Sequence, residues 1–183
     1  MEDLDPKAMA SSKILLSETL DIGCGPHCLP GAVGLDHMAF SGVQVVHDMN
    51  VAPWPLPNSQ FTFVRCQHVI EHIRELAVLA REIHRVSKNG ARVEFITPHY
   101  SSYASWGDPT HLYHFALGSI PQLFEMMVGP GKYKVLKNEI RFSGSGLDFF
   151  GWLIYKLSPK KYEKHFAWIF PANEIHTHVE IVK

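Results

Sequence analysis

Two glycines and two acidic residues follow short apolar segments in the first third of the chain. Gly23 and Gly25 lie in Leu20-Asp21-Ile22-Gly23-Cys24-Gly25, directly after an apolar run. Glycine is needed where the backbone takes a positive φ or lies close to a ligand. Asp36 follows the next apolar segment, where a carboxylate can accept hydrogen bonds from both hydroxyls of a ribose. Asp48 follows the third and could meet an adenine amino group, so the pattern indicates a nucleoside site. A Gly-x-Gly pair alone is also found in ordinary turns.

The apolar segments that position these residues are predicted to be strands, because each is short and stops at turn residues. The predicted strands are Leu15–Ile22, Ala32–Asp36, Val43–His47, Phe61–Cys66, Arg92–Thr97, Tyr133–Phe142 and His176–Val182. From Ile73 the apolar period becomes helical, and Asn89-Gly90 is predicted to end this helix. Val51–Ser59 is predicted to be a loop, and a short helix is expected near Ser119–Val128.

This order of elements predicts an α/β fold with a mostly parallel sheet and helices on its faces. The last two strands predict an antiparallel edge or hairpin. Open sheets of this type bind ligands at the carboxyl ends of their strands. The glycines and acids described above follow such strand ends.

The same residues resemble the class I S-adenosylmethionine-dependent methyltransferases over roughly residues 17–120. Leu20–Gly25 is similar to the first motif of that family, and Gly34-Leu35-Asp36 to its ribose-binding strand end. His47-Asp48, followed by a proline-rich stretch, resembles its adenine-side acid. Phe63–His72 resembles the family's fourth strand and the start of the following helix. Glu82–Gly90 resembles that helix and its Asn-Gly turn, and Val93–Pro98 resembles the fifth strand. The resemblance implies a seven-stranded Rossmann-like sheet, an enzyme that transfers methyl groups, and S-adenosylmethionine as cofactor.

The resemblance also implies roles for individual residues. Gly23, Cys24 and Gly25 would lie along the methionine end of the cofactor, with Asp21 shaping the loop. Asp36 would hold the ribose. The other implied contacts are His37 or Met38 beside the adenine, Asp48 and Met49 at the adenine edge, and Cys66, Gln67 and His68 beside the sulfonium.

One departure from the family pattern is the short connection after the first strand. Only Pro26 to Gly31 separate the glycine loop from the second strand. A crossover that contains a full helix needs about ten residues or more, so the first helix is predicted to be reduced to a turn. The resemblance therefore extends to a compact branch of the family that shares this connection and a Gly-Asp-Pro-Thr-His segment such as Gly107–His111. S-adenosylmethionine has no phosphate, so the lost helix N-terminus favours it over a dinucleotide.

His68-Val69-Ile70-Glu71-His72 matches the His-x-x-Glu-His pattern of inverted zinc peptidases. On an α-helix the two histidines could share a metal, with Glu71 as base. The segment falls where the fourth strand should end and a helix begin, where the helix dipole favours Glu71. We therefore expect no metal, and keep a zinc hydrolase acting through His68, Glu71 and His72 as an alternative.

The loop from Thr97 to Phe115 is rich in histidine and aromatic residues. It follows the fifth strand and is expected to overhang the cofactor's methyl group. Histidine suits proton transfer near neutral pH, so His111, and after it His68, are the candidate catalytic residues. His99 and His114 are expected to be core residues. Three histidines with Asp108 could also hold a metal.

The composition limits the partners. The 183 residues carry a formal net charge of -1, which argues against nucleic acid and favours a small-molecule, sugar or lipid-linked acceptor. We expect one methyltransferase-like domain over residues 1–183, with residues 1–13 flexible and residues 143–172 an aromatic insertion of helix and loop. The acidic N-terminus predicts no signal peptide, and hence a cytoplasmic protein.

Two alternatives stay open at this point. The first is a non-catalytic protein that binds S-adenosylmethionine or a nucleoside. The second concerns the aromatic block Leu147–Phe170, which could cover the sheet, cap the acceptor pocket, form a homodimer interface or dock at a membrane surface.

Overall fold

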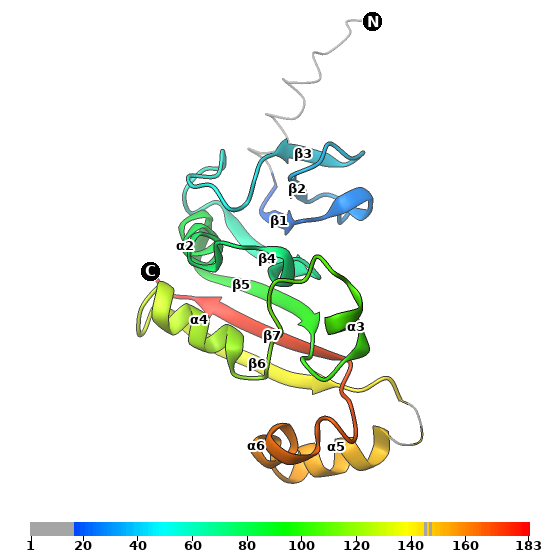
Figure 1. Cartoon of the computed structure of the whole chain (residues 1–183). Helices are drawn as coiled ribbons and strands as arrows, with labels where there is room; N and C mark the ends of the chain where they lie inside the picture. The colour runs from blue at the N-terminus through cyan, green and yellow to red at the C-terminus, as the bar shows by residue number, and fades with distance from the viewer. Residues whose placement is uncertain (1–16, 145, 147) are drawn as a thin grey trace, which may run out of the picture.

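Seven strands form one sheet in the order β3-β2-β1-β4-β5-β7-β6, as the computed structural model shows (Figure 1). The structure describes residues 17–144, 146 and 148–183. The strands are β1 (Thr19–Ile22), β2 (Val33–Asp36), β3 (Val43–Val46), β4 (Phe61–Gln67), β5 (Ser87–Pro98), β6 (Tyr133–Arg141) and β7 (Glu174–Ile181). The predicted flexible residues 1–13 lie outside the described residues, as do Leu15 and Leu16 of the first predicted strand.

The first five strands run parallel, and the last two are antiparallel to their neighbours. β1 lies between β2 and β4 in parallel register, with Ile22 opposite Leu35 and Cys66. β7 lies between β5 and β6 and pairs antiparallel with both. The predicted α/β class, with a mostly parallel sheet and an antiparallel C-terminal pair, is confirmed.

The connection from β1 to β2 contains one short turn of 3-10 helix, η1 (Gly25–His27), in place of a full helix. This confirms the predicted loss of the first crossover helix. Pro26 is the second residue of the turn, and Leu29 N donates a hydrogen bond of 2.9 Å to Asp21 Oδ2. The strand that precedes the turn therefore ties down its far end.

The helix α2 (Leu76–Val86) begins later and ends earlier than the sequence pattern predicts. Ile70–His72 forms a separate 3-10 turn, η2, and Ile73 is extended, so the helix does not begin at Ile73. The helix ends at Val86 because Ser87 already pairs with Phe61 in the sheet. Gly90, at φ +78°, lies in the irregular start of β5 and does not cap the helix.

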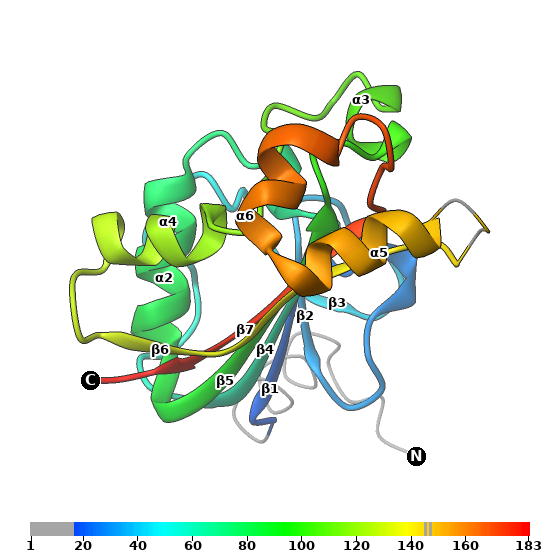
Figure 2. The same ribbon diagram turned by 90° about the horizontal axis from the view of Figure 1, so that it is seen from below.

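Helices α2 and α4 (Ser119–Met127) pack side by side against the same face of the sheet (Figures 1 and 2). The short helix α3 (Tyr103–Gly107) lies within the loop after β5. The aromatic block forms α5 (Asp148–Leu157), α6 (Pro159–Lys161) and η3 (Tyr162–Phe166), next to β6 (Figure 2). No helix in the described part of the chain combines the length and apolar character that crossing a bilayer requires.

A partly buried ion pair, with Glu82 buried and Arg85 half-buried, joins α2 to the proline-rich loop after β3. Arg85 donates two hydrogen bonds to Glu82, 2.8 and 2.6 Å long, and reaches the carbonyl oxygens of Trp54 and Leu56. Trp54 N donates to Glu82 Oε2 at 2.7 Å. Trp54 Nε1 in turn donates to the carbonyl oxygen of Met49 at 3.2 Å. The pair therefore holds the loop from Met49 onward against α2.

We expect Glu82→Ala to destabilise the fold. The change leaves Arg85 and the amide of Trp54 without their buried acceptor, and we expect a loss of about 2–4 kcal/mol in the free energy of unfolding. Chemical denaturation of the wild-type and variant proteins measures this loss. A loss below about 0.5 kcal/mol, the range of an ordinary surface substitution, would contradict the assignment.

The same pair predicts part of the acid sensitivity. Burial raises the pKa of Glu82, but the hydrogen bonds from Arg85 and Trp54 outweigh it and hold the pKa below its ordinary value of 4.5. A lowered folded-state pKa adds stability that is present above 4.5 and is lost as the pH falls through the folded-state value. We therefore expect the stability of Glu82→Gln to fall less steeply below pH 4.5 than that of the wild-type protein.

Candidate functional site

A cavity of about 690 Å³ opens at the carboxyl ends of the parallel strands. Its walls come from segments that follow β1, β2, β3 and β4, and from the loop after β5. The lining residues are Gly23, Asp36, His37, Asp48, Met49, Asn50, His68, Val69, His72, Ile73 and Thr110. Six of the residues predicted for cofactor binding are in this set: Gly23, Asp36, His37, Asp48, Met49 and His68. The topology thus brings together acids that are separated along the chain.

Asp36 is held rigidly at the end of β2. Its carboxylate is 4 % exposed and accepts 2.9 Å hydrogen bonds from Gly25 N at Oδ2 and from Met38 N at Oδ1. His37 Nδ1 lies 3.1 Å from Oδ1. A carboxylate offers about four lone-pair sites, so it can accept hydroxyl hydrogen bonds while keeping both backbone amides. Gly25 therefore acts through Asp36, and neither Gly25 nor Met38 is among the described residues that line the cavity.

Asp48 and Met49 form the wall that follows β3. Asp48 Oδ1 accepts hydrogen bonds from the backbone and side-chain nitrogens of Asn50, at 2.9 and 2.8 Å. These two bonds lower the pKa of Asp48 and keep it ionised. Both go to one oxygen, so Oδ2 is the oxygen suited to an amino group in the cavity. Met49 is buried beside it and is fixed through the indole of Trp54.

Gly23 is required by its neighbours as well as by its backbone conformation. Its φ is +60°, and a Cβ atom there would lie 2.3 Å from Val69 Cγ2. Gly25 has a similar φ of +54°, but a Cβ there would meet no atom within 4 Å. A side chain at Gly25 would cause backbone strain alone, whereas a side chain at Gly23 would cause both backbone strain and steric overlap with Val69.

We expect Gly25→Ala to cost about 1–2 kcal/mol, the strain of a left-handed residue. Gly23→Ala adds overpacking against Val69 and should cost about 2–5 kcal/mol in total. Thermal and chemical unfolding of both variants test the difference. The double variant Gly23→Ala/Val69→Ala relieves the overlap at the first site. Equal losses for the two single variants would show that Val69 yields freely.

Asp21 and Cys24 line a second, smaller cavity of about 250 Å³, which shares Gly23 and His68 with the first. Asp21 is 1 % exposed and receives two hydrogen bonds from Arg65, 2.8 Å to Oδ1 and 2.7 Å to Oδ2. It therefore shapes the glycine loop through Arg65 and Leu29. Burial raises the pKa of the Cys24 thiol to about 12, so it is protonated at neutral pH.

The three residues at the end of β4 have different environments. Cys66 is fully buried, and burial raises the pKa of its thiol, so its side chain belongs to the core. Gln67 lines the smaller cavity. His68 lines both cavities from a left-handed backbone at φ +52°. Such strain persists where the surroundings over-determine it and is frequent at functional sites.

Comparison with known proteins agrees with this geometry. The model of a methyltransferase domain family matches residues 5–127. The chain belongs to this methyltransferase family. The predicted resemblance and the predicted enzyme class are thereby confirmed.

Solved structures similar to this methyltransferase share its fold at low sequence identity. An S-adenosylmethionine-dependent methyltransferase from Archaeoglobus fulgidus is 16 % identical with a TM-score of 0.64, over 96 % of this chain and 94 % of its own. One from Mesorhizobium loti is 14 % identical with a TM-score of 0.58, over 97 % and 99 %. Phosphoethanolamine N-methyltransferase 2 of Haemonchus contortus, in complex with S-adenosyl-L-methionine, is 12 % identical with a TM-score of 0.56, over 91 % and 48 %. No curated protein sequence matches the chain.

His111 of the methyltransferase lies behind the cavity wall. Its side chain is 7 % exposed, and Nδ1 lies 3.0 Å from the carbonyl oxygen of Ser105. Its ring centroid is 4.6 Å from that of His72, which lines the cavity. His111 is not among the described lining residues, whereas His72 and Thr110 are. The sequence did not predict either residue as part of the cofactor cavity, although His72 lies in the His-x-x-Glu-His segment and Thr110 in the Gly-Asp-Pro-Thr-His segment.

The His-x-x-Glu-His segment does not form the helix that the peptidase pattern needs. His68 is left-handed, and only Ile70–His72 forms a 3-10 turn. The two histidines therefore do not lie one above the other on a helix face. His68 instead pairs with Glu71 and with Glu174, at 3.5 and 3.2 Å.

His99 and His114 have partners within the loop. His99 is fully buried, with Nδ1 2.8 Å from Ser101 Oγ. His114 stacks on Trp106 and lies 2.9 Å from Ser105 Oγ. The expectation of a core residue therefore holds for His99, which is buried, but is wrong for His114, which is exposed on the loop and held by Trp106 and Ser105.

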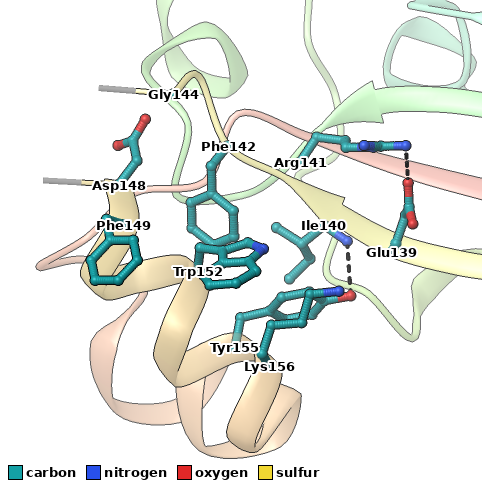
Figure 3. Close-up of a pocket in the computed structure, with 10 residues that line it drawn as sticks. All are labelled: Glu139, Ile140, Arg141, Phe142, Gly144, Asp148, Phe149, Trp152, Tyr155 and Lys156. Carbon is teal, nitrogen blue, oxygen red and sulfur yellow. Dashed lines mark hydrogen bonds and ion pairs between the residues drawn. The ribbon is translucent and has the colours of Figure 1, made fainter. Parts of the chain in front are cut away.

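A third cavity, of about 380 Å³, lies between the end of β6 and α5 (Figure 3). Trp152, Phe149 and Tyr155 face it, and Tyr155 Oη accepts a hydrogen bond from Ile140 N at 3.2 Å. It shares no residue with the cavity at the strand ends. The aromatic block thus packs on β6 around its own small core of Ile140, Tyr155, Tyr162, Ala167 and Ala172.

Proposed function

We propose that this methyltransferase binds S-adenosylmethionine in the 690 Å³ cavity and transfers its methyl group to a small-molecule, sugar or lipid-linked acceptor. The observation that carries the proposal is the pair of ordered carboxylates, Asp36 and Asp48, which line one cavity after the neighbouring strands β2 and β3. Both are fixed by backbone amides before any ligand binds. Such a site suits a ribose and an amino-substituted base.

The chemistry of the lining residues supports this cofactor. Asp36 would accept the ribose hydroxyls, and Asp48 with Met49 would meet the adenine. Gly23, with Asp21, Cys24 and Gln67 around the smaller cavity, would enclose the methionine end. When bound, S-adenosylmethionine supplies an electrophilic methyl group on a sulfonium. His68, which lines both cavities, would lie nearest the junction of nucleoside and methionine.

The chain's task on the acceptor side is to orient a nucleophile and to release its proton. We assign this task to His68, which lines the cavity, and to His111, whose ring contacts the lining residue His72. The net charge of -1 offers little attraction to a polyanion, which supports a small or lipid-linked acceptor over a nucleic acid.

Incubation with methyl-labelled S-adenosylmethionine tests the proposal. Small-molecule, sugar and lipid-linked acceptor pools are supplied separately, and labelled products are identified by mass spectrometry. We expect product in one class with the wild-type protein and much less with Asp36→Ala. Cofactor binding without product in any class would favour a binding protein that has no transfer activity.

A further inference from the structure

Three groups that bind metals meet beside the cavity, from two distant parts of the chain. A carboxylate oxygen of Glu71, a ring nitrogen of His72 and a ring nitrogen of His111 lie within 4.8 Å of one another. We propose that these three residues bind a divalent transition-metal ion such as Zn²⁺. This differs from the expectation of no metal, and it uses His111 in place of the His68 of the peptidase pattern.

Glu71 supplies an independent sign of a missing cation. The residue is 1 % exposed, and its Oε2 accepts a 3.0 Å hydrogen bond from Thr97. Its Oε1 is buried and has no hydrogen-bond partner among the described residues. The nearest basic group is His68 Nδ1, at 3.5 Å. This long ion pair is the one charged contact that the described residues give Oε1, and it leaves the buried oxygen without a hydrogen bond, which is costly. A metal ion would satisfy the oxygen more fully.

Hydrogen bonds prepare both imidazoles as ligands through the same nitrogen. His111 Nδ1 can only donate to the carbonyl oxygen of Ser105, so its Nε2 carries the lone pair. Thr110 Oγ1 donates to Asp108 Oδ1 at 2.6 Å and lies 2.9 Å from His72 Nδ1, from which it accepts. Nε2 of His72 therefore carries the lone pair as well. Metal-binding histidines are usually oriented in this way by a carbonyl or carboxylate partner of the other nitrogen.

The backbone holds the two segments together without a metal. Leu112 N donates a 2.8 Å hydrogen bond to the carbonyl oxygen of Glu71. The rings of His72 and His111 pack edge to face, at an angle of 70°. The ligands are thus ordered in advance, which lowers the conformational cost of binding an ion.

Two imidazoles and one carboxylate are a ligand set that suits Zn²⁺ and related ions. Sites with three protein ligands leave a coordination position open, as catalytic zinc sites do. His72 and Thr110 both line the cavity, so the open position would face it. On the proposed function, this position would bind an oxygen atom of the acceptor. That role rests on the proposed function, whereas the metal site does not.

A second cluster with metal-binding side chains among the described residues, Asp21, Cys24 and Cys28, lacks these features. Arg65 already neutralises Asp21 with two hydrogen bonds. The raised pKa of Cys24 disfavours the thiolate that a metal needs. We therefore assign the ion to Glu71, His72 and His111.

Zinc titration of the full-length, chelator-treated protein tests the site. We expect the wild-type protein to bind one equivalent of Zn²⁺. In His72→Ala and His111→Ala we expect the affinity for Zn²⁺ to be at least about 100-fold lower. Thr110→Val removes only the partner of His72 and should weaken binding about 10- to 100-fold. His165→Ala, which removes an exposed histidine of η3, is the matched control and should bind as the wild-type protein does.

Circular dichroism measures whether each variant is folded. If an alanine variant does not fold, Glu71→Gln and Thr110→Val are used to test the site in its place. No saturable Zn²⁺ binding by the wild-type protein would overturn the proposal. Equal affinity in the folded ligand variants would also overturn it. Binding of S-adenosylhomocysteine is measured separately, so a failure of the cofactor site leaves the zinc result interpretable.

Discussion

Replacing His111 with alanine is expected to lower methyl-transfer turnover by about 100- to 10,000-fold, the usual range for a lost acid–base group. Affinity for S-adenosylhomocysteine should stay nearly unchanged, because His111 is not among the described residues that line the cofactor cavity. His111 contacts the wall through His72 and the Thr110 segment. Turnover is measured with labelled cofactor and the acceptor found by screening.

His114→Ala is the matched control, because His114 lies in the same loop and also contacts Ser105, yet is outside the cluster. We expect its turnover to stay within a few-fold of wild type. Wild-type turnover in His111→Ala would contradict the assignment. Chelation separates the two roles open to His111. If His111 acts as a base without an ion, turnover of the wild-type enzyme persists in the presence of a chelator. If His111 is a metal ligand, the chelator abolishes turnover.

Replacing Asp36 with alanine is expected to weaken S-adenosylhomocysteine binding by about 1.5–3 kcal/mol, the value of hydrogen bonds to a charged group, or roughly 10- to 150-fold. The same change frees the amides of Gly25 and Met38, which could loosen the loop. Asp36→Asn keeps an acceptor for one of them and isolates the loss of charge. Calorimetry on both folded variants gives the affinities, and an unchanged dissociation constant would mean that the ribose lies elsewhere.

The positions of the strands along the chain and the short first connection could be predicted because each depends on local signals. Apolar segments that stop at Gly, Pro or Asp mark the strands. The few residues between Gly25 and Val33 leave no room for a full helix, and the structure has one 3-10 turn there. The acids at the ends of β2 and β3 follow from the same pattern, and the fold places both on one cavity.

The helix boundaries could not be predicted, because distant pairing decides them. Ile73 continues the apolar period of α2, but it is extended. Asn89-Gly90 looks like a helix end, yet Ser87 has already joined β4 through its pairing with Phe61. In both places tertiary contacts override a local preference.

The acceptor side was the least predictable part of the site. Cys66 lies one residue before the end of β4, and the strand's alternation turns its side chain into the core. His72 and Thr110 are 38 residues apart and meet only through folding. A motif search notes each of them separately and cannot place them in contact, nor can it place His111 behind them.

Isothermal titration of the wild-type protein with S-adenosylhomocysteine tests the central claim most directly. The cavity geometry predicts one saturable site per chain, displaced by S-adenosylmethionine and weakened in Asp36→Ala. The claim would be contradicted if the folded protein bound neither compound, with no heat of binding and no thermal stabilisation at millimolar ligand.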